Sequence, residues 1–178
     1  MQLNTVQKNN LPKLKQLYLS SFPKNERKPF YLMQIWQKRG KMEIMEINNN
    51  NEFLGLVITV IFSDLVLIDY FAVCSNLRGS GIGTKAIELI RQRYMGKRIF
   101  LEIEKPNRAA PDNGNRLRRK SFYLNCGLKS CGIPVRLFGV DMELLAFDKP
   151  INFDEYIEVY KHLAGNMITS RIELLGTV

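Results

Sequence analysis

A glycine-rich segment, Arg78 to Lys85, follows the apolar run Val66 to Val73 and opens a helix predicted over residues 82–94. Its glycines, at positions 79, 81 and 83, remove side chains where a backbone must approach a ligand closely. The first turn of a helix also presents unpaired amides and the positive end of the helix dipole. This arrangement predicts a binding site for a phosphate or pyrophosphate group.

Several known loop types compete for these glycines. A Walker loop is excluded, because a lysine and a hydroxyl residue do not follow the last glycine in the required order. A dinucleotide loop fits Gly79 and Gly81, but Thr84 stands where its third glycine should be, so this hypothesis remains a rival. The pattern R/Q-x-x-G-x-G/A is met in full by Arg78, Gly81 and Gly83. A further interpretation is that the glycines only make a tight turn between strand and helix.

Two carboxylates and a tyrosine could carry acid and base chemistry. Glu102 and Glu104 alternate with apolar residues in a strand predicted over residues 98–104, and Tyr123 lies in a helix predicted over residues 115–126. An alkylammonium with a pKa of about 10.4 must lose a proton before it can act as a nucleophile, and a carboxylate can accept that proton. In the alternative interpretation, the carboxylates are a polar strand face that pairs with Arg116 or Arg119, and the tyrosine is a half-buried ring.

Three motifs resemble one known family. The turn from Arg78 to Gly83 resembles the acetyl-CoA pyrophosphate turn of the GNAT-type N-acyltransferases. The segment Phe122 to Leu128 is similar to the F/L-Y-x-x-x-G-F segment that follows this turn in the family. Leu101-Glu102-Ile103 looks like the L-E-V strand of the ribosomal-protein alanine acetyltransferases. Together the motifs cover about residues 66–147.

The resemblance implies an enzyme that transfers an acetyl group from acetyl-CoA to a primary amine by direct attack in a ternary complex. It implies that Tyr123 protonates the departing CoA thiolate and that Glu102 is the general base, with Glu104 as the second candidate carboxylate. It also implies that the backbone N–H of Val73 polarises the thioester carbonyl. The cofactor-binding residues implied are Phe71, Ala72, Val73, Cys74, Arg78, Gly79, Ser80, Gly81, Ile82, Gly83, Thr84, Arg116 and Arg119. A non-catalytic module that binds acyl-CoA or a nucleotide is the alternative, and an amine of a small molecule or peptide is the expected acceptor.

The elements around these residues follow from hydrophobic periodicity. Antiparallel strands over residues 41–47, 53–62 and 65–73 precede the turn, and the helix crossover makes the strand over residues 98–104 parallel to the last of them. The remaining predictions are helices over residues 10–22 (capped by Asn10), 29–40 and 152–165 (capped by Asn152), a loop over 105–114, strands over 2–6, 128–133 and 140–147, a connection over 134–139, and a strand in the tail 167–178. With the resemblance, they predict a GNAT-like mixed α/β (α+β) fold. Its central sheet is largely antiparallel and flanked by helices, and two parallel strands splay at the cofactor site.

The length of 178 residues predicts a single N-acetyltransferase domain, residues 1–178, with core motifs over 66–147 and a C-terminal helix and strand over 150–178. The segment after Pro150 could pack on this domain or on a second subunit, as in a homodimer. The net charge of +9 predicts attraction to polyanions, including cofactor phosphates. The basic cluster sits beside the turn, which disfavours a nucleic-acid partner.

The numbers and positions of cysteine and histidine residues limit which metal sites the chain could form. The three cysteines lack metal-ligand spacing, which predicts reduced thiols, a cytoplasmic location and no bound metal. The single histidine, His162, is expected on a solvated helix face and excludes His-rich zinc sites. The apolar runs are too short for a membrane span, so no membrane partner is expected.

Overall fold

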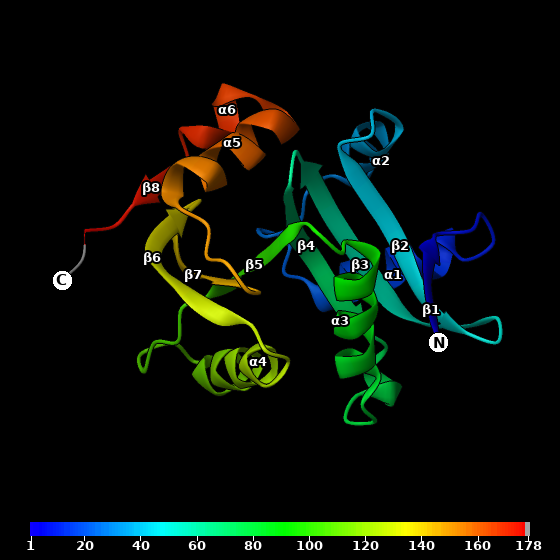
Figure 1. Ribbon diagram of the computed structural model, residues 1–178. Helices are drawn as coiled ribbons and strands as arrows, with labels where there is room; N and C mark the ends of the chain where they lie inside the picture. Colours follow the sequence, from blue (N-terminus) through cyan, green and yellow to red (C-terminus); the bar gives the residue numbers. More distant parts are fainter. Residues whose placement is uncertain (177–178) are drawn as a thin grey trace. The chain divides into compact units, whose positions relative to one another are not determined.

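The computed structural model (Figure 1) describes residues 1–176, except for the side chain of Met167. The chain folds into two compact units. The first unit comprises residues 1–61 and 68–95, and the second comprises residues 62–67 and the chain from residue 96 onward. Strand β4 (Leu65–Val73) contributes to both, because its first three residues belong to the second unit.

Eight strands form a mixed sheet in the order β1-β2-β3-β4-β5-β7-β6-β8. The strands besides β4 are β1 (Gln2–Thr5), β2 (Met42–Asn49), β3 (Glu52–Phe62), β5 (Arg98–Glu104), β6 (Lys129–Leu137), β7 (Val140–Ala146) and β8 (Ile172–Leu174). The sheet is mostly antiparallel, and β4 and β5 form its one parallel pair within the described chain. The predicted fold class, a largely antiparallel mixed sheet flanked by helices, is confirmed.

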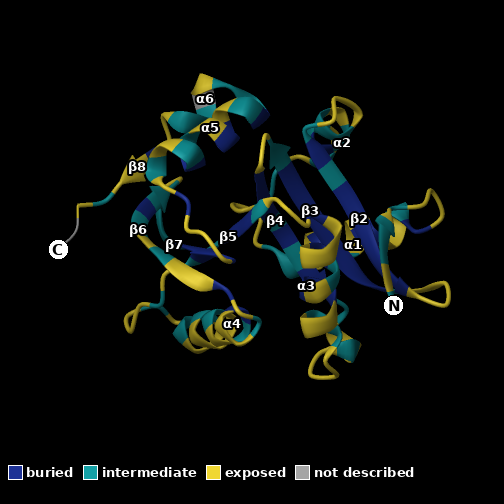
Figure 2. Cartoon of the chain, in the orientation of Figure 1, coloured by how far each residue is buried: buried dark blue, intermediate teal, exposed yellow. Residues whose placement is uncertain are grey.

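The first unit is organised around β2 and β3. An unbroken run of buried residues extends along β3 from Leu54 to Val60, as expected for a strand covered on both faces (Figure 2). Its helices are α1 (Leu11–Ser21), α2 (Phe30–Lys38) and α3 (Ile82–Arg93), with a short 3₁₀ turn at Ser75–Leu77. Each helix buries apolar side chains: Met33 on α2, Leu14 and Tyr18 on α1, and the stripe Ala86, Ile87 and Ile90 on α3.

A bulge in β3 lies against the end of β4. The register between β2 and β3 shifts between Ile47 and Asn48, which leaves Leu54 as an extra residue on β3. The next residue is Gly55, and a Cβ atom there would lie 2.4 Å from the backbone oxygen of Ala72. Only glycine therefore allows β3 and β4 to approach this closely.

The second unit holds α4 (Asn113–Asn125), α5 (Phe153–Ala164) and α6 (Asn166–Thr169). The predicted cap of α5 is confirmed as a capping box between Asn152 and Glu155. Arg98, the first residue of β5, bonds Glu155 at 2.6 Å and Asp64 at 2.8 Å. These contacts fix the start of α5 against the start of β5.

Two local predictions were wrong. Residues from Pro134 were predicted as a connection, but β6 continues through this proline to Leu137. The ladder to β7 is irregular between Ser130 and Pro134, and a proline is tolerated where a strand loses its regular pairing. Asn10 was predicted to cap α1, yet its backbone is already helical and its side chain makes no capping hydrogen bond.

The tail contains α6 and β8, so the strand predicted over residues 167–178 is confirmed only in part. Thr177 and Val178 lie outside the described residues. Cys74, Cys126 and Cys131 form no disulfide bond. Among residues 1–176, none of the helices combines the length and the apolar character that a bilayer crossing requires.

We expect Gly55→Ala to destabilise the protein by about 1–3 kcal/mol, because the added methyl group would overlap the backbone of β4. Urea unfolding measures this change. Gly114→Ala is the matched control, since its Cβ would meet no atom within 4 Å and lies in the first turn of α4. An equal stability of the Gly55→Ala variant and the wild type would contradict the close approach.

Candidate active site

The end of β4 leaves one backbone amide directed away from β3. Cys74 donates its N–H to the carbonyl of Leu54 at 2.9 Å. Because successive N–H groups along a strand point to opposite sides, the N–H of Val73 points away from β3. Ala72 is buried, whereas Phe71, Val73 and Cys74 are half-buried. Four residues of the predicted pantetheine site therefore form a partly accessible strand end.

The glycines of the turn are required by backbone geometry. Gly79 and Gly81 have φ angles of 82° and 81°, in the left-handed region that favours glycine. A Cβ atom on either would meet no atom within 4 Å, so the space beside both residues is open. The turn is fixed by Ser80, whose hydroxyl donates to the Leu77 carbonyl at 2.6 Å, and by Arg78, whose Nε donates to the Val73 carbonyl at 3.3 Å.

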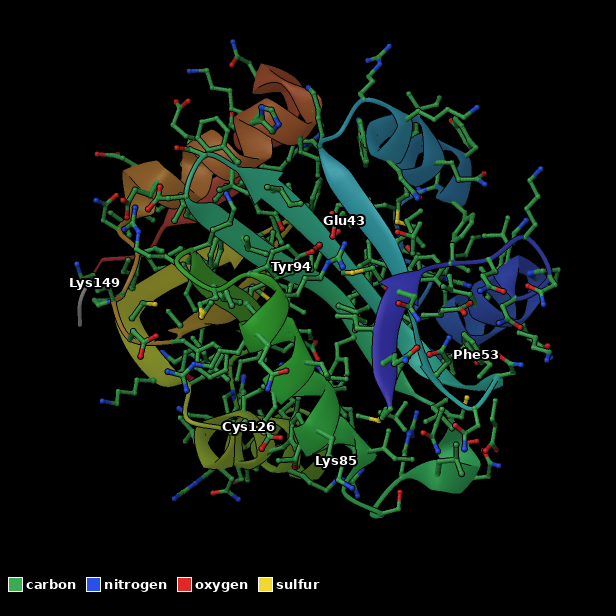
Figure 3. The ribbon with its side chains drawn as sticks, turned by 45° about the vertical axis from the view of Figure 1, so that its right-hand side comes forward. Glu43, Phe53, Lys85, Tyr94, Cys126 and Lys149 are labelled. Carbon is green, nitrogen blue, oxygen red and sulfur yellow. The ribbon has the colours of Figure 1, made fainter. Side chains whose placement is uncertain are left out.

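The N-terminus of α3 has the features of an anion site. The amide of Lys85 donates to the carbonyl of Gly81 at 3.1 Å, so the amides of Ile82, Gly83 and Thr84 precede the first helical hydrogen bond. The helix has no side-chain cap and no acidic residue in its first turn. Lys85 lies at this same end of α3 (Figure 3). The positive end of the helix dipole is therefore not neutralised by a carboxylate of its own first turn.

In the second unit, Glu102 accepts hydrogen bonds from two tyrosines of α5. The hydroxyl of Tyr160 donates to Oε1 at 2.5 Å, and the hydroxyl of Tyr156 donates to Oε2. Both tyrosine rings are buried, and Glu102 itself is half-buried. Glu102 is therefore held in place by hydrogen bonds from neutral hydroxyl donors of α5.

Glu104, Arg116 and Arg119 are brought together by salt bridges. Arg116 contacts one oxygen of Glu104 at 2.9 Å, and Arg119 contacts the other at 3.5 Å. Arg116 also bonds Asp112 at 2.9 Å, and this bond lowers the pKa of the Asp112 carboxyl. The alternative interpretation, a strand carboxylate paired with these arginines, is therefore observed for Glu104. Glu102 has tyrosine partners from α5.

Tyr123 is buried on α4, with only 8% of its surface exposed. Burial raises the pKa of Tyr123 to about 12, and the nearby charge of Arg119 acts in the opposite direction. The ring packs edge-on against Phe122, with centroids 5.0 Å apart. Tyr123 is therefore a neutral phenol that keeps its proton at every physiological pH.

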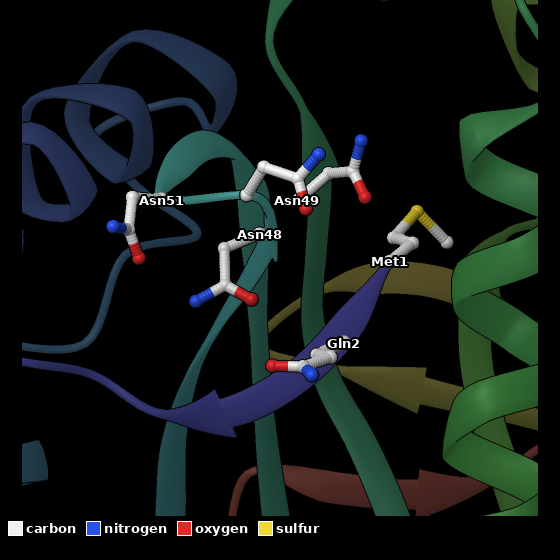
Figure 4. Close-up of a pocket in the computed structure, with 6 residues that line it drawn as sticks. Met1, Gln2, Asn48, Asn49 and Asn51 are labelled. Carbon is white, nitrogen blue, oxygen red and sulfur yellow. The ribbon is translucent and has the colours of Figure 1, made fainter.

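Two hollows in the described surface are lined by other residues than those predicted to be catalytic or to bind the cofactor. One, of about 240 Å³, is lined by Met1, Gln2 and the asparagines at positions 48–51 (Figure 4). None of these residues was predicted to act. A second, of about 370 Å³, lies along α4 and is lined by Lys105, Pro106, Leu117, Lys120, Ser121, Leu124 and Glu143. The backbone geometry of the turn therefore identifies the candidate site better than the size of any hollow.

Sequence reasoning missed Gly55, Tyr156 and Tyr160. An isolated glycine within an apolar strand is a recognised signal of a bulge or a close backbone approach, so Gly55 could have been found. The two tyrosines lie 54 and 58 residues beyond Glu102, and no local pattern connects them to it. In the described part of the chain, no three His, Cys, Asp or Glu side chains are grouped to hold a metal ion.

The chain has an α/β fold in which a glycine turn leads into a helix whose N-terminus has no side-chain cap. Residues 11–123, more than half of the chain, match the model of the acetyltransferase (GNAT) family. The chain therefore belongs to the GNAT acetyltransferase family, whose members are acyltransferases.

Solved structures of low sequence identity share this fold. A putative GNAT acetyltransferase from Bacteroides thetaiotaomicron has a TM-score of 0.77 at 17% identity, with 95% of this chain and 99% of that chain covered. A Bacillus subtilis acetyltransferase in complex with CoA has a TM-score of 0.59 at 17% identity, covering 83% and 98%. An aminoglycoside 6'-N-acetyltransferase complexed with coenzyme A has a TM-score of 0.62 at 14% identity, covering 82% and 96%. No curated protein sequence matches the chain.

The raised pKa of Tyr123 predicts a loss of stability in alkali. Below pH 10 the phenol is neutral in both states, whereas between pH 10 and about pH 12 only the unfolded chain releases the proton. Over this window the wild type should lose about 1.4 kcal/mol per pH unit more than Tyr123→Phe does. Urea unfolding at a series of pH values measures the difference.

Tyr31→Phe, which removes a phenol that is 64% exposed, is the control and should follow the wild type. If the free energy of unfolding depends on pH in the same way for the wild type and Tyr123→Phe, the phenol titrates alike in the folded and unfolded chain and the prediction is wrong.

Proposed function

We propose that the chain, residues 1–178, is a single acetyl-CoA-dependent N-acetyltransferase domain. The observation that carries this proposal is the end of β4, where an open glycine turn leads into a helix without a cap. Membership of the GNAT family supports acetyl transfer in general. Two neighbours of the same fold were solved in complex with CoA, which supports CoA as the carrier.

The turn fits the diphosphate of CoA. A Cβ at Gly79 or Gly81 would project into open space, and a ligand can approach the backbone through that space. The amides of Ile82, Gly83 and Thr84 would donate to phosphate oxygens, and the helix dipole favours the negative charge. The half-buried strand end from Phe71 to Cys74 would hold the pantetheine arm.

Acetyl-CoA supplies the acetyl group as a thioester, which the amine of the acceptor attacks directly. The Val73 N–H, directed away from β3, would donate a hydrogen bond to the thioester carbonyl. A fixed backbone donor stabilises negative charge as it develops on that oxygen and needs no reorganisation.

Glu102 would serve as the general base, directly or through a water molecule. Its oxygens accept neutral hydroxyl donors, whereas those of Glu104 face two guanidinium groups. Glu104 is already engaged in ion pairs with two arginines, so we assign the base role to Glu102. Glu104 would instead orient Arg116 and Arg119 toward the phosphates of the cofactor.

Tyr123 would donate its proton to the departing CoA thiolate. Because burial keeps this phenol protonated up to about pH 12, the acid carries its proton over the whole neutral range.

Calorimetry with CoA tests the phosphate site. We expect Gly81→Ala to weaken CoA binding by roughly tenfold, equivalent to one lost charge-assisted hydrogen bond. Gly96→Ala is the matched control, because Gly96 also has a positive φ, 85°, and open space around its Cβ position. Equal CoA affinities in the two variants, or no CoA binding by the wild type, would refute the proposed site.

Steady-state kinetics with a panel of amines tests the catalytic roles. Glu102→Gln and Tyr123→Phe should each lower kcat by about 10²- to 10⁴-fold, while the Kd for CoA stays close to the wild-type value. Glu104→Gln should mainly weaken CoA binding, because it releases Arg116 and Arg119. A chain that binds CoA but acetylates no amine would be a non-catalytic binding module.

A further inference from the structure

One carboxylate in the first unit is buried with unused bonding capacity. The side chain of Asp69, on β4, is only 2% exposed. Its Oδ1 bonds the ammonium of Lys28 at 2.6 Å, while its Oδ2 is the one buried side-chain oxygen or nitrogen in residues 1–176 without a hydrogen-bond partner. Buried polar atoms in folded proteins nearly always have partners, so an unpartnered carboxylate oxygen indicates a missing donor.

A cluster of aromatic rings lies beside the cation that Asp69 binds. The Lys28 ammonium lies 5.1 Å from the ring centroid of Tyr70. Tyr18 and Phe22 pack edge-on against Tyr70, with centroids 4.9 Å and 4.8 Å away. A carboxylate beside aromatic rings attracts a cation by charge, by hydrogen bonding and by the ring quadrupole.

The backbone of Lys28 is held independently of its ammonium. Its N–H donates to the hydroxyl of Tyr70 at 3.0 Å, and its carbonyl accepts from the hydroxyl of Tyr18 at 2.9 Å. The Tyr70 hydroxyl also donates to the carbonyl of Glu26 at 2.8 Å. The Lys28 side chain can therefore leave Asp69 while the loop between α1 and α2 stays in place.

We propose that Asp69 and Tyr70 form an anchor for a cationic group of the acceptor, and that the Lys28 ammonium occupies this anchor in the free protein. This inference rests on the proposed function, because it assigns the acceptor class for the same site. An incoming ammonium has three donors, so it can replace the bond of Lys28 to Oδ1 and also satisfy Oδ2.

The distance between Asp69 and Val73 along β4 determines how far apart the two charged groups of the acceptor must be. Asp69 and Val73 are four residues apart on β4, which at about 3.3 Å per residue separates them by about 13 Å on one face of the strand. If the reacting amine lies at the Val73 amide, the second cation lies near this distance from it. The acceptor class is therefore a long diamine or polyamine with well-separated charges.

Calorimetry with diaminooctane and octylamine as probes tests the anchor, with and without CoA. We expect the wild type to bind the diamine more tightly than the monoamine. Asp69→Asn should weaken diamine binding by roughly tenfold or more, the effect of losing a charged hydrogen bond. Lys28→Met should tighten it, because the competing internal ammonium is gone.

The two variants should change diamine affinity in opposite directions, whereas loss of a purely structural ion pair would not tighten diamine binding in either variant. Arg93→Met, which removes another ion pair of the first unit, is the matched control and should leave diamine binding unchanged. If Lys28→Met fails to tighten diamine binding, the inference is wrong, even if Asp69→Asn does not fold. If the wild type binds CoA but does not prefer the diamine to the monoamine, the anchor alone is refuted. If the wild type does not bind CoA at all, the proposed function is refuted.

Discussion

Strand β4 can end where it does because its neighbour has no side chain at Gly55. The backbone oxygen of Ala72 lies only 2.4 Å from the position that a Cβ on residue 55 would take, and β3 bulges at the neighbouring Leu54. The last rung is the hydrogen bond from Cys74 to Leu54. After it the chain leaves the sheet, and positive φ angles at the turn glycines direct it into α3. The proposed thioester donor and the proposed phosphate site both depend on this one strand end.

In the second unit, the two strand carboxylates differ through their partners. Glu102 and Glu104 are alternate residues of β5 and face the same side of the strand. One receives two neutral hydroxyl donors from α5, and the other is paired with two guanidinium groups from α4. Helix α5 reaches Glu102 because the capping box and the bonds of Arg98 fix its first turn. The different partners of the two carboxylates therefore originate in helix placement.

Local patterns in the sequence predicted most of the elements. Alternating apolar residues predicted β5. Glycines predicted the start of α3 at Gly81 and the end of α5 at Gly165, and Asn152 with Glu155 predicted the capping box of α5. The pattern failed where tertiary pairing overrides local preference, as at Pro134, which β6 incorporates at an irregular point of its ladder. It also could not pair Glu102 with tyrosines more than fifty residues away, because that contact depends on how α5 returns to the sheet.

The first unit carries a negatively charged side chain on β4 and the positive end of a helix dipole at the start of α3, which follows β4 in the chain. The start of α3 favours anions, whereas Asp69, earlier on β4, favours cations. The net charge of +9 attracts an anionic cofactor over a long range but repels a polycationic acceptor. Salt screens such fields beyond about 8 Å at physiological ionic strength, while a buried carboxylate is screened much less. Long-range attraction therefore favours the cofactor, and a cationic acceptor requires a short-range contact such as Asp69 offers.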